Sequence, residues 1–394
     1  MGSKAQTQLL EALEAQCKNG HSIPLSHFMQ HVLGHPEYGY YAQNTAIGAD
    51  GDFITAPEIS PLFGEIIGAF ITYIWELSGK PDAHSAFYFE AGPGRGSLLA
   101  DMLRVFRHHD CALKDSQLSL LETSLRLQTR IRAHLGSGAT GTDISHQLDF
   151  ISTLDSLPAK PLFGVANEFF DALGVDQAIF TDRGWYWHEI FCTPPHRFHL
   201  APAHPLTADQ ISRYRLPPTA DLGTIVEISA MAESITARLA AHIAQYGGVL
   251  VIADYGKTDN IGDTIQAVKQ HNSHPFFADI GTADLTHLVD FSALARQTDA
   301  HKARFIGPVF QADFLKELGL FERTEALRRP DQPEFNRQLV AGADRLTSPA
   351  QMGQIFKIAA ILPAGEGLPP GFSTYHAAPE AVTDTMPASR SQPA

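Results

Sequence analysis

The sequence predicts an α/β fold built on a doubly wound, Rossmann-like parallel sheet, with an N-terminal helical extension and helical insertions. Two observations predict this class. Short apolar runs of strand length alternate with longer segments of helical periodicity. One of these transitions, FEAGPGRG at residues 89–96, joins an apolar run to a helical pattern through an acidic residue and three glycines. In α/β folds, a strand, a tight glycine turn and a helix bring backbone close to a nucleotide-like ligand.

The N-terminal residues 1–80 predict a helical extension. Residues 7–34 have the pattern of two short helices, and Ser60 and Pro61 suit the N-cap and first position of a third. Apolar residues from 62 to 75 form a wide stripe that suits packing on a sheet. We expect the loops of this extension to cover a ligand, although a purely structural collar explains the same residues.

The spacing of the glycines predicts which ligand binds. A dinucleotide fingerprint, G-x-G-x-x-G, needs a glycine where Ser97 stands. Instead, Glu90 ends the strand, and Gly92, Gly94 and Gly96 follow at two-residue intervals. A carboxylate there repels a pyrophosphate but attracts the sulfonium and ammonium groups of S-adenosylmethionine. We therefore expect this cofactor, with Glu90 at its methionine end and the three glycines in close backbone approach. The alternative is a glycine-rich turn that binds nothing.

A second apolar run, residues 118–121, ends at Glu122 and is followed by a helical pattern over 124–135. An acid at the end of the second strand commonly binds the ribose hydroxyls of an adenosine ligand, so Glu122 is a candidate cofactor-binding residue. Glu122 could instead cap the helix. A weaker signal predicts a third strand within residues 150–154.

A fourth strand, residues 161–166, ends in Asn167, with Glu168 and Asp171 shortly after. Ligands of doubly wound sheets sit at the carboxyl ends of strands, so these three side chains reach the rim of the cofactor site. Carboxylates match the planar guanidinium of an arginine substrate, and a pair of acids can orient its nitrogen and accept a proton. The local alternative is that Asn167 caps a helix whose first turn holds both acids.

The length predicts one elaborated domain or two, and the remaining segments predict its internal boundaries. We expect a ligand-binding core over residues 81–256 with an insertion at about 181–222, because that stretch is rich in proline and histidine. Residues 257–303 are polar and irregular and predict an insertion or lid. Residues 304–362 complete the sheet. Residues 363–394, rich in Pro, Ala, Ser and Thr, predict a disordered tail.

Two further parts of the predicted core are a strand pair and a strand that ends in an acid and an aromatic residue. Residues 175–180 and 184–191 predict paired strands joined by a turn. The core strand at 248–253 ends in Asp254 and Tyr255, which are secondary site candidates because they fall at the same sheet edge.

The composition limits the classes of partner. The chain has 29 basic and 43 acidic side chains, a formal charge of −14, which disfavours nucleic acid and favours cationic partner segments. Three scattered cysteines indicate a reducing compartment. No signal-peptide pattern and no apolar run of membrane-spanning length occurs, so we expect a soluble protein without a membrane span. Neither H-E-x-x-H nor C-x-x-C occurs, so we expect no metal site.

Five segments carry a resemblance to a known family: GHPEYGYY, GDFITAPEIS, FEAGPGRGSLLADML, ANEFFDALGVDQ and GQIFKIAAI. They resemble the MidA-like family of class I S-adenosylmethionine-dependent methyltransferases, over about residues 7–362. The resemblance implies a seven-stranded class I methyltransferase sheet. It also implies symmetric dimethylation of an arginine on a partner protein, a quinone-proximal complex I subunit for the mitochondrial members. It implies a location in the cytoplasm of a bacterium or in the mitochondrial matrix of a eukaryote.

Two departures from the family pattern concern Gly174, where the family usually has proline, and Thr123-Ser124, where it has a Ser-Pro pair. We expect Gly174 to loosen the segment after the NEFFDAL motif. Two other functions remain open: methylation of a small molecule on the same fold, and a non-catalytic assembly chaperone for which Glu168 and Asp171 would be dispensable. A dehydrogenase is disfavoured by Ser97. The oligomeric state is not predicted.

Overall fold

The central sheet of the computed structural model has the seven main strands that the family resemblance implies, and one further short strand. The structure describes residues 4–43, 55–136 and 144–376. The strand order is β14-β15-β9-β4-β1-β2-β3, and a short strand, β13, also pairs with β9. β1 pairs in parallel with β2 and β4, β2 with β3, and β4 with β9, whereas β15 runs antiparallel to β9 and to β14. The strands of this sheet are β1 Phe87–Ala91, β2 Gln117–Leu121, β3 Leu148–Ile151, β4 Leu162–Asn167, β9 Gly248–Lys257, β13 Val289–Asp290, β14 Ala303–Phe310 and β15 Phe356–Pro363.

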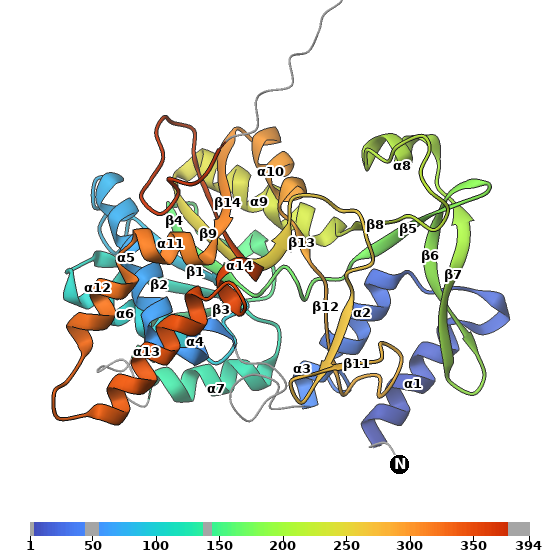
Figure 1. The fold of residues 1–394 in the computed structure, drawn as a ribbon, viewed down its shortest axis with the longest axis horizontal. Coiled ribbons are helices and arrows are strands. Elements are labelled where there is room, and N and C mark those ends of the chain that lie inside the picture. The colour runs from blue at the N-terminus through green and yellow to red at the C-terminus, as the bar shows by residue number, and fades with distance from the viewer. Residues whose placement is uncertain (1–3, 44–54, 137–143, 377–394) are drawn as a thin grey trace, which may run out of the picture.

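Helices cover both faces of this sheet (Figure 1). Successive residues of β1 point to opposite faces, so Tyr88 joins one apolar core and Phe87 and Phe89 join the other. The first core is closed by α5, α6, α7 and the C-terminal helices, and the second by α9 and α10. These helices are α5 Pro61–Leu77, α6 Ser97–His108, α7 Leu125–Gly136, α9 Ala230–Tyr246, α10 Phe291–Ala300, α11 Gln311–Glu317, α12 Leu320–Leu327, α13 Pro333–Thr347 and α14 Met352–Ile355.

Local sequence signals explain where several helices begin. The Ser60 hydroxyl accepts a hydrogen bond from the backbone N–H of Leu62, and Pro61 is the first residue of α5, as predicted. The two N-terminal helices also form as predicted, with a third and fourth short helix after them. Their bounds are α1 Lys4–Gln16, α2 Leu25–Gly34, α3 Tyr40–Gln43 and α4 Ala56–Ile59. Single 3₁₀ turns lie at Lys18–Gly20, Ala112–Asp115, Ser145–Gln147 and Leu154–Ser156.

A second, antiparallel sheet lies beside the core and contains the predicted strand pair (Figure 1). Its order is β7-β6-β5-β8. Its strands are β5 Asp176–Thr181, β6 Gly184–Thr193, β7 Arg197–Pro205 and β8 Ile225–Ile228, and α8 Ala208–Arg213 lies between the last two. The expected insertion is therefore ordered structure, and the strand at 225–228 belongs to this sheet. α1 and α2 pack on it through one apolar cluster that includes Leu9, Phe28 and Ile190.

Two expectations from the C-terminal half need correction. Residues 257–303 are not irregular: they hold a small sheet (β10 Gln266–Lys269, β11 Asn272–His274, β12 Asp284–Thr286), β13, and α10 on the central sheet. The expected disorder after residue 363 is wrong up to residue 376. Phe372 is fully buried against the rings of Phe70 and Phe314, because the returning chain covers α5 and α11. Residues 377–394 lie outside the described part.

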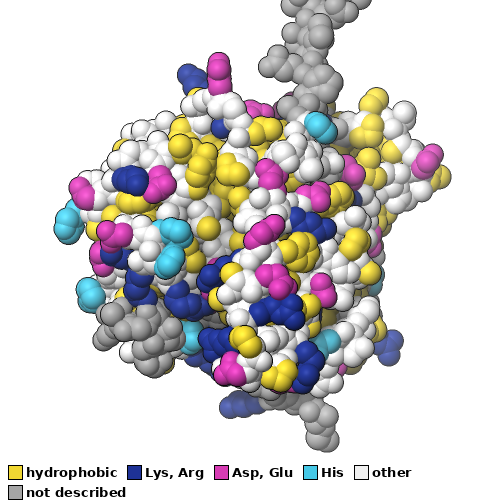
Figure 2. All heavy atoms as spheres, turned by 60° about the vertical axis from the view of Figure 1, so that its left-hand side comes forward, with side chains coloured by type: hydrophobic (Ala, Val, Ile, Leu, Met, Phe, Trp, Pro, Cys, Tyr) yellow, Lys and Arg dark blue, Asp and Glu magenta, His cyan; other side chains and the backbone are white. Residues whose placement is uncertain are grey.

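The surface carries interspersed charges. On the face of Figure 2, Lys and Arg side chains alternate with Asp and Glu side chains rather than forming one continuous basic area. Ion pairs such as Arg323–Glu65, at 2.7 Å between α12 and α5, belong to this pattern. Among the described helices, none is long and apolar enough to cross a membrane.

Candidate active site

The end of β1 carries the predicted acid and the predicted glycine turn. Glu90 is buried, and its Oε2 accepts a hydrogen bond from the Tyr88 hydroxyl at 2.8 Å. Burial raises the pKa of Glu90 to about 7, and the Tyr88 hydrogen bond opposes that rise only in part. The Tyr88 hydroxyl is a neutral donor, so it stabilises the ionised form of Glu90 only in part. A cationic ligand would stabilise that form further.

The three glycines of the turn all have the left-handed backbone that favours glycine, with φ of 65°, 54° and 82° at Gly92, Gly94 and Gly96. A Cβ on Gly92 would lie 3.0 Å from the ring of Phe169, so a side chain there would crowd the segment after β4. Gly96 is the N-cap of α6. The turn therefore fits the close backbone approach that the sequence predicts.

The segment after β4 is not a helix, so the alternative in which Asn167 caps one is wrong. Residues 168–175 form a loop, and Glu168 adopts a positive φ of 48°. Glu168 Oε1 accepts hydrogen bonds from the backbone N–H of Ala56, at 3.1 Å, and from the Asn167 amide, at 3.2 Å. A non-glycine residue held at positive φ by its surroundings is typical of functional loops.

Asp254, at the end of β9, holds this loop in place. Its Oδ2 accepts hydrogen bonds from the backbone N–H groups of Phe169, Phe170 and Asp171, at 3.2, 2.9 and 3.3 Å. Asp254 is fully buried. A buried carboxylate that accepts hydrogen bonds from three successive N–H groups fixes the path of that segment. Asp254 is therefore an organiser of the loop.

Three acceptor oxygens at the end of β4 and on the following loop have no hydrogen-bond donor among the described residues. Asn167 Oδ1, Glu168 Oε2 and Asp171 Oδ1 are buried and lack a hydrogen-bond donor within the described ranges. Burial, and then the charge of Asp171, raises the pKa of Glu168 to about 8, and burial raises the pKa of Asp171. Each buried acceptor without a hydrogen bond lowers the stability of the folded chain by about 1–3 kcal/mol. A ligand that donates several hydrogen bonds would remove this cost.

A cavity of about 60 Å³ joins the two strand ends. It is lined by Glu90, Gly92 and Gly94 at the end of β1, by Asn167 and Glu168 at the end of β4, and by residues of α4 and of the α6 N-terminus. Ligand pockets typically enclose roughly 300–1,000 Å³, so side chains that line this cavity must move apart when a cofactor-sized ligand enters. Gly96, Glu122 and Asp171 do not line it.

Glu122 instead accepts a hydrogen bond within the loop that follows β2. Its Oε1 accepts a hydrogen bond from the Ser124 N–H at 2.6 Å, and burial raises its pKa. A proline at position 124 would remove this donor, which gives the Ser-Pro departure a physical consequence. The end of β2 still lies beside the glycine turn, because the Gly92 N–H donates to the Leu121 carbonyl.

The other departure, Gly174, does not loosen the chain. A Cβ there would lie 2.4 Å from the backbone oxygen of Ser26, so glycine lets the loop pack directly on α2.

Several residues that surround the loop were missed from the sequence. The Tyr41 hydroxyl donates to Asp284 Oδ1 at 3.4 Å, and the His287 N–H donates to the Asp171 carbonyl at 3.2 Å. His287 Nε2 lies 3.0 Å from the Leu173 carbonyl. Tyr41 lies in α3, and Asp284 and His287 lie in the segment 284–287. Both segments are more than a hundred residues from the loop in the sequence, so no spacing rule connects them to it.

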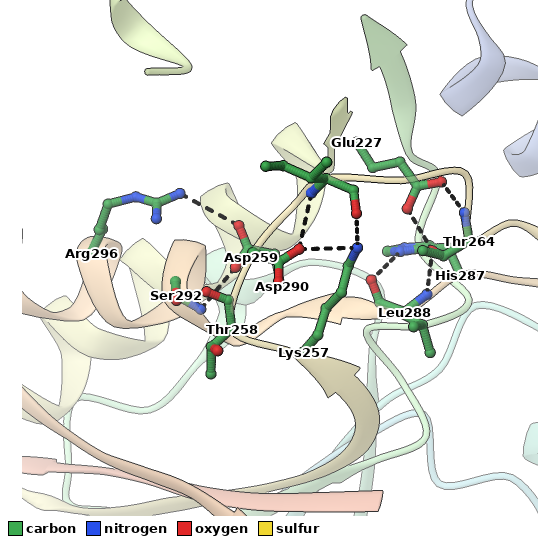
Figure 3. Close-up of polar contacts among 11 residues, drawn as sticks. Glu227, Lys257, Thr258, Asp259, Thr264, His287, Leu288, Asp290, Ser292 and Arg296 are labelled. Carbon is green, nitrogen blue, oxygen red and sulfur yellow. Dashed lines mark hydrogen bonds and ion pairs between the residues drawn. The ribbon is translucent and has the colours of Figure 1, made fainter. Parts of the chain in front are cut away.

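A second cavity, of about 200 Å³, lies between α9, α10 and the chain after α8. Polar side chains that line it, such as Glu227, Asp290 and Arg296, have partners in the protein (Figure 3). Asp290 Oδ1 accepts from the Ser292 N–H at 2.9 Å, and Asp290 Oδ2 lies 3.6 Å from Arg296. Glu227 accepts from the Thr264 N–H and hydroxyl at 2.8 and 2.5 Å.

The central sheet and its first turn define the class of protein. The order of the seven strands, the lone antiparallel strand β15, and the acid and glycine turn after β1 are those of class I S-adenosylmethionine-dependent methyltransferases. Comparison with known proteins agrees. The chain belongs to the family described as "Putative S-adenosyl-L-methionine-dependent methyltransferase", whose model matches residues 66–309.

Relatives and solved structures cover nearly the whole chain. The mitochondrial protein arginine methyltransferase NDUFAF7 of Rattus norvegicus is 35% identical over 91% of this chain and 85% of its own length. The Homo sapiens protein is 33% identical over 91% of this chain and 84% of its own. A Burkholderia thailandensis protein crystallised with S-adenosyl-homocysteine is 26% identical, with a TM-score of 0.84 over 96% of this chain and 98% of its own. This chain is thus an S-adenosylmethionine-dependent methyltransferase.

Proposed function

We propose that this methyltransferase transfers a methyl group to a guanidinium nitrogen of an arginine in a partner protein. The observation that carries the proposal is a pair of buried acceptor oxygens, Asn167 Oδ1 and Glu168 Oε2, whose residues line the cavity and which have no hydrogen-bond donor among the described residues. A guanidinium presents five N–H donors in one plane and is the side chain best suited to such acceptors. The names of the relatives, protein arginine methyltransferases, support the same acceptor.

In this proposal the chain's own residues position and deprotonate the acceptor. Glu90 and the backbone of Gly92 and Gly94 hold the methyl donor, which supplies an electrophilic methyl group on a sulfonium. Glu168 Oε2 and Asn167 Oδ1 accept hydrogen bonds from the guanidinium and aim one nitrogen at the methyl carbon. The nitrogen–carbon bond forms as the sulfur–carbon bond breaks, and the nitrogen's proton passes to Glu168.

Glu168 suits this role because burial and the Asp171 charge raise its pKa to about 8, which makes it a stronger base than an exposed carboxylate. Asp171 supplies the second negative charge that balances the guanidinium. Glu122 as the ribose acceptor and Gly96 as a cofactor contact remain predictions.

The finer identity of the substrate remains a prediction. A complex I subunit and the symmetric dimethyl product follow from the family resemblance. Relatives are named mitochondrial, which favours the matrix if the source is eukaryotic and leaves the bacterial cytoplasm as the other prediction.

The test is methylation of a purified quinone-proximal complex I subunit, using methyl-labelled S-adenosylmethionine and mass spectrometry of the product. We expect label on arginine only, and loss of the label when that arginine is replaced by lysine. Glu168→Gln should lower the rate about 10²–10⁴-fold. Label on a lysine or on a small metabolite would contradict the proposal. A labelling rate that Glu168→Gln leaves unchanged would also contradict it.

A further inference from the structure

The short helix α4 of the N-terminal extension contacts the end of β4 through a backbone group. Ala56 is its first residue, and the Ala56 N–H donates to Glu168 Oε1 at 3.1 Å, across 112 residues of sequence. The first N–H groups of a helix have no partner within the helix. The Thr55 side chain at the N-cap accepts none of them, so Glu168 caps α4 from another part of the chain.

The two carboxylate oxygens of Glu168 differ in their contacts. Oε1 accepts hydrogen bonds from the Ala56 N–H and from the Asn167 amide, whereas Oε2 has no donor among the described residues. The Glu168 backbone is fixed separately, because its N–H donates to the Ala253 carbonyl at 2.9 Å. Contacts at Oε1 therefore determine where Oε2, the oxygen assigned to the acceptor nitrogen, is aimed.

The helix α4 is itself held firmly enough to orient a side chain. Glu58 Oε1 accepts a hydrogen bond from the Ser97 hydroxyl at 2.6 Å, which ties α4 to the start of α6. A Cβ on Gly342 of α13 would lie 2.9 Å from Ser60 Cβ, so α13 packs closely on the junction of α4 and α5. Ala56 is fully buried. Its N–H therefore has a fixed position relative to the sheet.

We propose that the Ala56 backbone N–H is a positioning group for the reaction, which aims Glu168 at the acceptor nitrogen and stabilises its ionised form. A hydrogen bond from an N–H to a carboxylate is charge-assisted and is stronger when the acid is ionised. The role deepens the function proposed above and rests on it for the assignment of Glu168 as the base. The competing explanation is that Glu168 only stabilises α4, as a distant cap.

Loss of the Ala56 N–H has a consequence that a purely structural contact lacks. The pKa of Glu168 is raised to about 8 by burial and by the Asp171 charge, and the Ala56 hydrogen bond opposes that rise. Without this donor the pKa rises further, so less of Glu168 is ionised at neutral pH. The other charged groups that act on Glu168 or line the same cavity are Asp171, Asp254, Asp284, Glu58, Glu90 and Arg95.

An amide-to-ester substitution at Ala56 removes the donor without adding a side-chain atom and leaves those charged groups in place. Lactic acid replaces alanine through in vitro translation with a lactate-charged suppressor tRNA. We expect the rise of kcat/KM near pH 8 to move about 1 pH unit higher. The ester should therefore lower kcat/KM about 10-fold at pH 7 and less than about 2-fold at pH 9.5. Ala56→Gly keeps the N–H and should keep the profile.

A matched control lies in the same helix. The Ile59 N–H donates to the Thr55 carbonyl at 3.2 Å, and Ile59 does not line the cavity. An amide-to-ester substitution at Ile59 therefore weakens α4 by one hydrogen bond without touching Glu168. We expect it to leave the pH midpoint unchanged. If Glu168 only capped α4, both esters would lower the rate by a similar factor at every pH.

Thermal unfolding gives a second measurement that needs neither the donor nor the acceptor. With the ester at Ala56, folded Glu168 keeps its proton to higher pH, so stability continues to fall between about pH 8 and 9, where that of the unaltered chain has levelled. The unfolding temperature lost to this ester should thus grow by about 1–2 °C from pH 6 to pH 9.5. The growth should vanish in the Glu168→Gln background and in the Ile59 ester.

Two results would overturn the positioning role: a pH midpoint that the Ala56 ester leaves unmoved while Glu168→Gln still lowers the rate, or an unfolding difference that does not change with pH. Failure of the proposed function gives a different result. A methylation rate that Glu168→Gln leaves unchanged rejects Glu168 as the base, and the pH-dependent coupling in thermal unfolding then decides the Ala56 contact by itself.

Discussion

The cavity between the ends of β1 and β4 and the cavity beside α9 and α10 differ in hydrogen bonding as well as in size. The larger, of about 200 Å³, has carboxylates that are already bonded, such as Asp290 to Ser292 and Glu227 to Thr264. The smaller, of about 60 Å³, has Asn167 Oδ1 and Glu168 Oε2 buried without a donor in the described ranges. Buried acceptors without hydrogen bonds cost stability, so we use them rather than volume to assign the proposed function to the smaller cavity.

The largest expected effect comes from adding a side chain to the glycine turn after β1. A valine at Gly94 has a β-branched side chain where φ is 54° and the backbone faces the cavity, so Gly94→Val should weaken S-adenosylmethionine binding at least about 100-fold. Gly79→Val is the matched control, because Gly79 also has a positive φ, of 86°, but lies in open space away from both cavities. Calorimetry measures both, and normal binding by Gly94→Val would remove the glycine turn from the site.

The next effect compares a carboxylate in each cavity. Glu168→Gln should lower the methylation rate about 10²–10⁴-fold and change the affinity for S-adenosylhomocysteine less than about 3-fold. Glu233 lines the larger cavity and already accepts a hydrogen bond from Gln297 at 3.0 Å. Glu233→Gln should therefore leave the rate within about 2-fold. Similar losses for both variants would erase the distinction between the cavities.

The pH profile sharpens the comparison further. Glu168 must be ionised to receive the guanidinium, and its pKa is about 8, so kcat/KM should rise with pH and level off above about 8. The Glu90 pKa of about 7 adds a second rise at lower pH. The Glu233→Gln profile should match that of the unaltered chain, whereas the residual activity of Glu168→Gln should lack the rise near 8. A profile that falls between pH 6 and 8 would contradict the assignment.

The smallest expected effect is on stability. Because the pKa of Glu168 rises from 4.5 when unfolded to about 8 when folded, the folded chain holds more protons between these values. Stability therefore falls as pH rises through this window. Glu168→Gln removes that loss and should unfold about 1–3 °C higher than the unaltered chain at pH 9, with no difference near pH 4.5. Thermal unfolding at both pH values checks this, and a lower unfolding temperature for the variant at pH 9 would contradict it.

The parts of the site that were predictable are those coded within one strand and its following turn. Glu90, Gly92 and Gly94 are set by local spacing, and the structure brings them to one cavity with Asn167 and Glu168. Position at a strand end was enough for this, because parallel strands deliver their carboxyl ends to one edge.

The parts that were not predictable depend on contacts between distant segments. The loop after β4 is held by Asp254, 84 residues from Phe170, which accepts its N–H groups. Glu58 reaches Ser97 from 39 residues away, and His287 reaches Leu173 from 114 residues away. β8, the strand at 225–228, pairs antiparallel with β5. The alternation of apolar and polar residues within a strand does not say which sheet the strand joins.

The most direct test of the central claim is a crystal structure of the chain with S-adenosylhomocysteine and an arginine-containing peptide. The account predicts guanidinium nitrogens within about 2.7–3.2 Å of Glu168 Oε2 and Asn167 Oδ1, with one nitrogen facing the sulfur. An arginine bound elsewhere, with those two oxygens bonded only to water, would contradict it.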